Sequence, residues 1–454
     1  MKQDKTFLGT EPIGRLLLKL AVPTVVAQLV NMLYNIVDRI YIGHMPGDGS
    51  LALTGVALPL IMIISAFAAL ISSGGAPRAS IAMGKGDHAT AEKILGGCFS
   101  LQIIISIILT AVMLLWSGDL LAAFGASGNT IGYATDYMSI YAAGTLFVQL
   151  TLGMNAFITA QGFANISMWT VIIGAIANIT LDPIFIFGFK MGVRGAALAT
   201  VISQGISCVW VICFLTGKKT ILRLKKENLI AAPKLILPCV ALGLSTFIMQ
   251  ASESVISVCF NSSLLKYGGD IAVGAMTILT SIMQFAMLPL QGIAQGAQPI
   301  TSYNYGAGNA DRVSKTFRLL LTVCLSYSFL LWGCIMLFPA VFAKIFTSDA
   351  ELVAFTAKAL RIYCAVLFIF GIQIACQMTF VSIGNAVCSI SVAVLRKFVL
   401  LLPLIYILPH VIADQTMSVY TAEPFADIIA VSCTGILFAS RFRKALKKLR
   451  EKNA

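Results

Sequence analysis

Charged residues are scarce in this 454-residue chain: aspartate, glutamate, lysine and arginine together make up only 11% of it. Soluble domains are usually about 25% charged and about 45–50% apolar. This chain is 58% apolar and has a mean hydropathy of +0.90, which excludes a soluble globular protein. Apolar runs of about 20 residues, long enough to cross a bilayer, recur along the whole sequence. The composition therefore predicts an all-α polytopic membrane protein.

The motifs of several enzyme classes are also missing. The chain has no G-x-x-x-x-G-K-[ST] segment, so we expect no ATP hydrolysis. It has neither the G-x-S-x-G motif of hydrolases nor the H-E-x-x-H motif of zinc peptidases. Its three histidines are far apart, and its 11 cysteines include no C-x-x-C pair, so neither residue type predicts a metal site. We therefore expect that the protein is not an enzyme and has no cofactor apart from a transported ion.

The net charge of +13 is unevenly distributed along the predicted topology. With the N-terminus in the cytoplasm, most lysines and arginines of the loops lie on the cytoplasmic side, as the positive-inside rule requires. Both termini are then cytoplasmic. The basic residues are not interleaved with aromatic residues, so we expect no nucleic-acid partner. The twelve predicted membrane spans are residues 15–43, 53–76, 94–117, 133–158, 166–189, 195–216, 234–262, 271–296, 319–343, 357–382, 388–411 and 420–440.

An internal repeat divides the chain into two halves. At an offset of 222 residues Pro77 corresponds to Pro299 and Asn155 to Gln377, and at an offset of 215 Pro23 corresponds to Pro238. We predict an N-terminal six-helix lobe (1–217), a cytoplasmic basic linker (218–233), a C-terminal six-helix lobe (234–440) and a cytoplasmic basic tail (441–454). Six is even, so the second half enters the membrane from the same side and the two repeats are parallel. Transporters built from such repeats bind substrate near the midplane, between the halves; a duplicated scaffold without a transport role is the alternative.

Polar side chains recur on single faces of the predicted helices, at spacings of three and four residues. A carboxylate at the centre of a bilayer costs about 2.5–3.5 kcal/mol on insertion scales, so we interpret Asp38, Asp182 and Glu253 as functional. Ion pairs with Arg39, Arg396 or Lys397 are the structural alternative. Hydrogen bonds between helices are the alternative for the amides. The residues expected to line a substrate site are Asn31, Asn35, Asn155, Gln250, Glu253, Gln284, Gln291 and Gln377.

Three prolines lie inside or beside these polar helices. Pro23 and Pro238 occupy equivalent places in the two halves, and Pro183 directly follows Asp182. A proline inside a helix removes one backbone hydrogen bond and permits a bend. We therefore predict hinges at Pro23, Pro183 and Pro238.

Four stretches of the chain are similar to one family of membrane transporters. They are Y-N-I-V-D-R-I-Y-I-G (34–43), N-I-T-L-D-P-I-F-I-F-G (178–188), G-V-R-G-A-A-L-A-T (192–200) and N-Y-G-A-G-N (304–309). With the two six-helix halves and the basic linker, they resemble the multidrug and toxic compound extrusion (MATE) family, and most closely its bacterial exporters of cationic drugs. The resemblance covers essentially the whole chain.

The resemblance implies a multi-pass antiporter in the inner (cell) membrane of a bacterium, which exports cationic amphipathic drugs by alternating access in exchange for Na⁺ or H⁺. It also implies a cation-coupling site formed by Asp38, Asn178, Asp182 and Thr200. These residues offer the hard oxygen donors that bare cations need, so the same four would be the ligands of Na⁺. The two aspartates could instead share protons, and both alternatives stay open.

The second half departs from the family pattern. Some members carry a further carboxylate on the tenth helix, where this chain has only Gln373 and Gln377. Our hypothesis is that Glu253 attracts the cationic substrate instead of completing a second ion site.

Flippases for lipid-linked polysaccharide or peptidoglycan precursors belong to the same superfamily and are the alternative function. We expect such proteins to hold a diphosphate with basic residues in the central cavity, whereas this chain places amides and acids there. The expected partners are thus an organic cation and the lipid bilayer. We expect a monomer, because no small-xxx-small helix face predicts a dimer.

Overall fold

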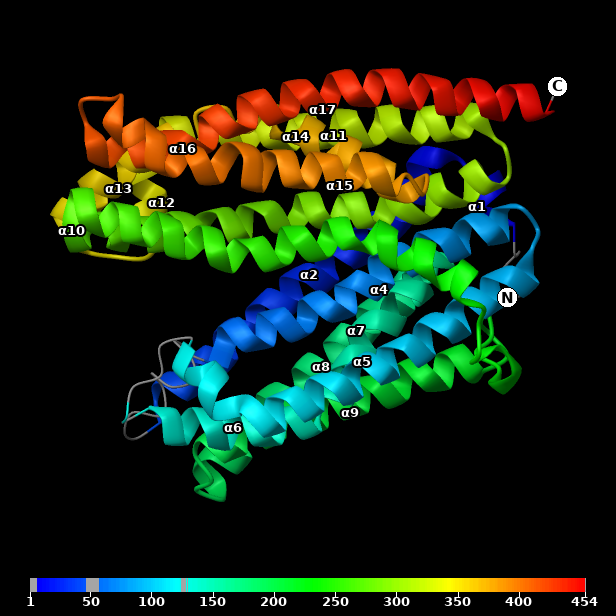
Figure 1. Ribbon diagram of the computed structural model, residues 1–454, viewed down its shortest axis with the longest axis horizontal. Coiled ribbons are helices and arrows are strands. Elements are labelled where there is room, and N and C mark those ends of the chain that lie inside the picture. The colour runs from blue at the N-terminus through cyan, green and yellow to red at the C-terminus, as the bar shows by residue number, and fades with distance from the viewer. Residues whose placement is uncertain (1–5, 46–56, 124–127, 129, 454) are drawn as a thin grey trace.

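The computed structural model describes residues 6–45, 57–123, 128 and 130–453, and these residues are helical almost throughout. Figure 1 shows two groups of helices that converge at the end where both termini lie and diverge toward the other end. We refer to the helices within residues 13–216 as the N-lobe and to those within residues 233–453 as the C-lobe. The described chain is thus all-α, as the composition predicts.

The N-lobe begins after a short helix, α1 (Phe7–Thr10). Its α6 and α7 meet at a bend of 56° and together make one broken span. The helix α8 passes directly into a π-helix, η2. The elements are α2 (Ile13–Gly43), α4 (Leu58–Gly84), α5 (His88–Ala123), α6 (Ile131–Ala143), α7 (Thr145–Ala160), α8 (Ala164–Pro183), η2 (Ile184–Gly188) and α9 (Val193–Thr216).

The C-lobe contains a second broken span, in which α13 and α14 are bent by 46°. It also contains a π-helix, η5, between α15 and α16. The elements are α10 (Pro233–Gly306), α11 (Ala310–Leu337), α12 (Pro339–Lys344), α13 (Ala350–Tyr363), η4 (Leu367–Ile369), α14 (Phe370–Ser382), α15 (Ala386–Val394), η5 (Leu395–Leu401), α16 (Leu402–Ile407), η6 (Leu408–His410) and α17 (Gln415–Asn453).

The described residues account for twelve membrane passes. Nine helices are long and apolar enough to span a membrane, and the two bent pairs raise this to eleven. The helix α10 has 74 residues, but its backbone is non-helical at Gly269, where φ is 64°. Residues on both sides of Gly269, such as Phe260 and Leu279, pack in one core cluster. The chain therefore turns back on itself at Gly269, and α10 contributes two passes, which brings the total to twelve.

Equivalent residues of the two halves have the same local structure. Gly86 and Gly308 both have φ of 79°, which side chains other than glycine rarely adopt. The Asn155 amide donates to the Ser167 carbonyl at 3.3 Å, and 222 residues later the Gln377 amide donates to a serine carbonyl at 3.3 Å. The predicted parallel repeat is confirmed by these matched turns and hydrogen bonds.

The helices extend beyond the predicted spans. The predicted spans end where the first charged residues lower the hydropathy, whereas the helical backbone continues past those residues. The clearest case is α17, which runs through the predicted basic tail as one helix of 39 residues. Its last fifteen residues are rich in alanine, leucine, lysine and arginine, which favour helix, and contain neither glycine nor proline. The part of the second predicted span before residue 57 lies outside the described residues.

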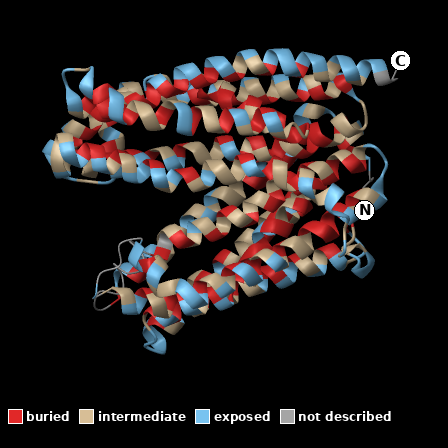
Figure 2. Ribbon diagram, in the orientation of Figure 1, coloured by how far each residue is buried: buried red, intermediate tan, exposed pale blue. Residues whose placement is uncertain are grey.

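The two lobes touch through glycines at the convergent end. A Cβ atom at Gly84 of α4 would overlap the backbone of Tyr303 in α10, and one at Gly306 would overlap Ile81 in α4. Nearby, the Thr24 hydroxyl of α2 donates to the Gly292 carbonyl at 2.6 Å. Figure 2 shows buried residues along the facing sides of these helices. Only glycine lets the helix backbones approach this closely, so these positions set how tightly this end closes.

The short helix α1 bridges both lobes at the same end. The Asn304 amide and the Arg312 guanidinium of the C-lobe donate to the Leu8 carbonyl at 2.9 and 3.3 Å. On the other side, a Cβ atom at Gly162 of the N-lobe would overlap the ring of Phe7. The segment before the first membrane helix thus contacts both halves of the repeat.

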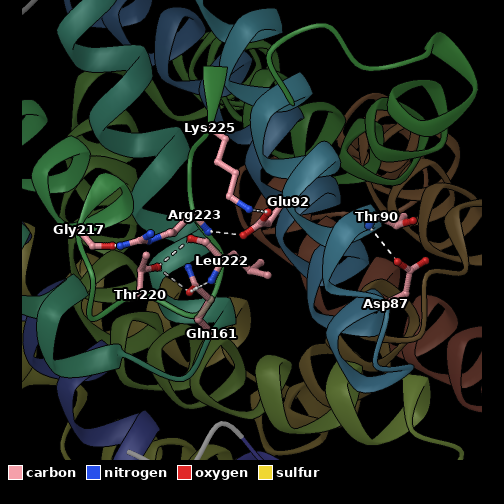
Figure 3. A network of polar contacts seen from close by, with 9 residues as sticks. All are labelled: Asp87, Thr90, Glu92, Gln161, Gly217, Thr220, Leu222, Arg223 and Lys225. Carbon is pink, nitrogen blue, oxygen red and sulfur yellow. Dashed lines mark hydrogen bonds and ion pairs between the residues drawn. The ribbon is translucent and has the colours of Figure 1, made fainter. Parts of the chain in front are cut away.

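The linker between the lobes is docked on the N-lobe (Figure 3). The side-chain oxygen Oε1 of Gln161 accepts three hydrogen bonds, from the Thr220 hydroxyl and from the backbone N–H groups of Ile221 and Leu222, at 2.8–2.9 Å. The Lys225 ammonium lies 2.6 Å from the Glu92 carboxylate. These contacts fix the path of the chain from α9 to α10.

Candidate functional site

The predicted cation-site residues meet in the N-lobe, where α2, α8 and α9 pack together. Asn178 and Asp182 lie one turn apart on α8 and are both buried, at 3% and 0% exposure. The Asn178 amide donates to one oxygen of Asp182 at 3.4 Å. Asp38 reaches the same place from α2, where its carboxyl group is within hydrogen-bonding reach of Asp182. Spacing on two separate helices thus places three of the four residues side by side.

The pairing of Asp38 with Asp182 requires a positive charge. Ionised carboxylates only accept hydrogen bonds, so two of them approach each other closely only when a proton or a cation lies between them. Three oxygens here, Asp38 Oδ1, Asn178 Oδ1 and Asp182 Oδ2, are buried without a hydrogen-bond partner. Unpaired buried oxygens are costly, and both a proton and a bare alkali ion would satisfy them. The donor set therefore fits either a proton or an alkali cation.

Thr200 lies at the edge of this cluster. Its hydroxyl donates to the Ala196 carbonyl one turn earlier in α9, at 3.0 Å, and also makes a side-chain hydrogen bond with Tyr137 of α6. The Tyr137 side chain in turn interacts electrostatically with Asp38 and Asp182. Thr200 is thus joined to the aspartates through a tyrosine.

Two tyrosines of the site were not among the residues predicted from the sequence. Tyr34 interacts electrostatically with both Asp38 and Asp182, and Tyr137 does the same from α6. The spacing of four between Tyr34 and Asp38 places them on one face of α2, a signal that could have found Tyr34. No local pattern links Tyr137 to α2 or α8.

The predicted substrate residues divide into two groups. Five of them are exposed on the inner helices α2 and α10: Asn31, Gln250, Glu253, Gln284 and Gln291. The other three are held by hydrogen bonds within their own lobe. Asn35 donates to the carbonyl of residue 31 at 2.7 Å, and the amides of Asn155 and Gln377 bond to Ser167 and Ser389, respectively, across neighbouring helices.

The C-lobe contains a cluster of five charged residues. The Lys397 ammonium of η5 lies 2.7 Å from the Glu253 carboxylate of α10, which is the ion pair considered as the structural alternative. The Arg396 guanidinium instead contacts Glu423 and Asp427 of α17, both at 2.7 Å. These last two residues were not predicted from the sequence, although their spacing of four within an apolar span could have indicated them.

The third basic residue considered as an ion-pair partner behaves differently. Arg39 is exposed at the surface of α2, and within the described ranges no salt bridge joins it to Asp38. This agrees with the helical rotation of about 100° between consecutive residues.

The predicted hinges are placed as follows. Pro23 is buried within α2, and the adjacent Thr24 hydroxyl donates to carbonyls one turn earlier and to the C-lobe carbonyl of Gly292. Pro183 is the last residue of α8, where the π-helix η2 begins. Pro238 lies inside α10, next to the interlobe contact of Cys239 with Gly74. Two of the three prolines therefore lie where the lobes meet.

Twelve apolar passes, a parallel internal repeat and carboxylates buried inside one lobe define a polytopic membrane protein with the architecture of repeat-built transporters. A family model named MatE matches this chain twice, over residues 23–184 and 245–407. These two matches cover more than half of the chain and coincide with its two halves. The chain belongs to the MATE family.

Individual relatives agree with this assignment. The chain is 25% identical to "Multidrug export protein MepA" of Staphylococcus haemolyticus over 374 residues, which cover 82% of each chain. It has a TM-score of 0.91 and 23% identity to a structure described as the outward-facing conformation of a multidrug resistance MATE family transporter, covering 98% of this chain and 99% of that one. A transporter from Pyrococcus furiosus, described as having reverse polarity of its binding pocket, is 24% identical with a TM-score of 0.90 and covers 98% of this chain and 99% of that one. At these identities the solved structures establish the fold alone.

Proposed function

We propose that this protein is an antiporter that exports cationic amphipathic drugs by alternating access between its two lobes, driven by Na⁺ or H⁺. The observation that carries the proposal is the group of three unpartnered oxygens of Asp38, Asn178 and Asp182, buried inside the N-lobe. A proton or a small cation would satisfy these buried oxygens. The name of the staphylococcal relative, a multidrug export protein, supports the same reading.

The helix α2 connects the ion site to the interface between the lobes. Near its start, Thr24 donates to the Gly292 carbonyl and Gln28 to Gln295, at 2.6 and 3.2 Å. Further along the same helix, Asp38 reaches Asp182. Ion binding between these carboxyls would fix the second half of α2 against α8, and Pro23 allows the first half to change its contact with α10. A bend at Pro23 is the step by which we expect the ion to favour one arrangement of the lobes.

The polarity of the exposed inner surface favours a cationic substrate over a lipid diphosphate. The exposed residues of α2 and α10 that were predicted to line the substrate site are four amides and one carboxylate, Glu253. The cation paired with Glu253 lies behind it: the Lys397 side chain is only 6% exposed, whereas that of Glu253 is 63% exposed. A ligand therefore meets a negative charge first, which repels a diphosphate.

The proposed topology places the convergent end, with both termini, in the cytoplasm of a bacterium. The arrangement in Figure 1 is then closed toward the cytoplasm and divergent toward the outside. The positive linker and the basic end of α17 lie on the cytoplasmic side, as the positive-inside rule requires.

Efflux of ethidium, a fluorescent organic cation, tests the proposal in cells that express the wild type, Asp38→Asn or Asp119→Asn, with and without sodium at two pH values. Asp119 is an exposed carboxylate of the same lobe and serves as the matched control. We expect export by the wild type and the control and none by Asp38→Asn, and the sodium and pH dependence identifies the ion. Absence of export from cells with normal membrane expression of the wild type would contradict the proposal and favour the flippase alternative.

A further inference from the structure

The C-lobe cluster is unbalanced in charge. It contains three carboxylates, Glu253, Glu423 and Asp427, and two cations, Arg396 and Lys397. Beyond the direct contacts, Glu253 acts electrostatically on Arg396 and Lys397 on Glu423, so the five groups form one connected system. With all of them ionised, the cluster has one negative charge in excess. It therefore has room for one further positive charge.

The two cations of the cluster are held in different ways. The Arg396 guanidinium contacts both Glu423 and Asp427 at 2.7 Å and lies 4.8 Å from the centre of the Phe370 ring. Its planar fork is thus engaged on two edges and one face, which fixes it in place. The Lys397 ammonium is a compact charge on a flexible stem, and the hydrogen bond that the structure gives it is the one to Glu253. Lys397 is therefore the cation that is able to move.

The order in which a ligand meets this pair is fixed by burial. The Glu253 side chain is 63% exposed and the Lys397 side chain 6%. Glu253 also belongs to a stripe of polar residues on α10 at spacings of three and four, with Gln250 before it and Ser257 after it, both exposed. Within a membrane such residues face the protein interior or a water-filled cavity, not lipid. A cation approaching from this exposed side meets the carboxylate, with the lysine behind it.

We propose that Lys397 is a competing counter-ion at the substrate site: it occupies Glu253 in the empty transporter and releases that carboxylate to the cationic group of the substrate. The released ammonium moves toward Glu423, whose side chain is 10% exposed. Lys397 already interacts electrostatically with this carboxylate. This inference rests on the proposed function, because it needs Glu253 to bind the substrate. It assigns Lys397 a role in specificity and not in binding.

The competition sets which cations bind. A bare monovalent ion gains only the attraction of Glu253, for which it must displace an ammonium already in contact. An amphipathic cation gains the burial of its apolar part in addition. Lys397 therefore disfavours small inorganic ions at Glu253 and favours organic ones, which separates the substrate carboxylate from the ion site of the N-lobe.

The test is the dissociation constant of ethidium, measured by fluorescence anisotropy on the purified full-length transporter, with Lys397→Met, Lys397→Arg and the control Lys344→Met. Lys344 is an exposed lysine of the same lobe. Removal of the competitor should tighten ethidium binding by up to about fivefold, the upper end of the range for a partly exposed ion pair. In Lys397→Met, raising the sodium concentration should also weaken ethidium binding more steeply than in the wild type.

The arginine variant gives a result in the opposite direction. A guanidinium keeps the positive charge and grips a carboxylate with two N–H groups, so Lys397→Arg should weaken ethidium binding. It also retains the charge balance, and so tests the inference if Lys397→Met does not fold. A merely structural lysine would instead leave binding unchanged in every folded variant, and that result overturns the inference. A wild type that binds no ethidium contradicts the proposed function itself, which keeps the two failures apart.

Discussion

Replacing Gly84 by alanine should open the convergent end of the molecule. Gly84 is the last residue of α4 and faces the C-lobe helix α10. A Cβ atom at this position would lie 2.9 Å from the Ala307 nitrogen and closer still to the Tyr303 carbonyl oxygen, whereas real Cβ atoms essentially never come within 3.0 Å of another atom. Both neighbours are backbone atoms, so no side-chain rotation relieves the overlap. The two helices must separate.

The size of the effect follows from the cost of overpacking. One extra methyl group in a well-packed contact costs about 1–3 kcal/mol. If this cost falls only on the arrangement in which the lobes touch, the population in which they are separated rises about 5- to 150-fold. A glycine of the same fold without neighbours provides the control: nothing lies within 4 Å of a Cβ atom at Gly333, so Gly333→Ala should leave the lobes as they are.

A native cysteine reports the separation. Cys239 of α10 is fully buried in the interlobe contact, packed within a core cluster of N-lobe residues. Its contact is with Gly74, which lies ten residues before Gly84 on α4. After the exposed cysteines are replaced by serine, the rate at which N-ethylmaleimide labels Cys239 measures how often the lobes part. We expect faster labelling in Gly84→Ala and the wild-type rate in Gly333→Ala. Labelling of Gly84→Ala at the wild-type rate in a folded protein would refute the reasoning.

Three further predictions concern stability. Arg396→Met should lower the free energy of unfolding by about 3–5 kcal/mol, because its two carboxylate partners are left buried and unpaired. Thermal melting checks this: the melting temperature should be restored only when both partners are also replaced by their amides. Gln161→Leu should release the linker, since buried donors without a partner cost about 1–3 kcal/mol each. Trypsin should then cleave the linker between the lobes faster, and an unchanged cleavage rate would contradict its docking on the N-lobe. Hydrogen bonds from Thr90 lower the pKa of Asp87 below its ordinary value, so Asp87 stabilises the start of α5 above its unfolded pKa and this contribution is lost as the pH falls through the lowered folded pKa; hydrogen exchange in the first turn of α5 should show this pH dependence in the wild type and not in Asp87→Asn.

The parts of the structure that follow from local patterns could be predicted from the sequence. The twelve passes follow from runs of apolar residues, and the repeat follows from matched residues such as Pro77 and Pro299. The spacing of four between Asn178 and Asp182 placed both on one face of α8. The cost of a carboxylate within the membrane singled out Asp38, which the structure places within reach of Asp182. Each of these inferences needs only the geometry of a single helix or the comparison of the chain with itself.

The parts that depend on contacts between distant segments could not be predicted. The approach of Tyr137 to Thr200 is a consequence of how α6 packs against α9. From the sequence, Arg396 was considered as an ion-pair partner of Asp38, Asp182 or Glu253. In the structure it pairs with two other acids, Glu423 and Asp427 of α17. Spacing identifies which residues share a face, and only packing determines which faces meet.

The continuity of helices was a second limit. Hydropathy ended the last span at residue 440, but α17 continues to Asn453, because charged residues end a membrane span without ending a helix. Likewise, the docking of α1 between the lobes depends on Asn304 and Arg312, which lie about 300 residues away. No local signal connects them.

The central claim is that ion binding in the N-lobe is coupled to drug binding between the lobes. The most direct test is the dissociation constant of ethidium for the purified protein, measured with and without sodium at two pH values, in the wild type and in Asp38→Asn. By linkage, an ion that biases the lobes must change drug affinity, typically 5- to about 150-fold, and the drug must change ion affinity by the same factor. We predict such a change in the wild type, in response to sodium or to pH, and its loss in Asp38→Asn. An ethidium affinity that responds to neither ion, or that responds equally in Asp38→Asn, would contradict the account.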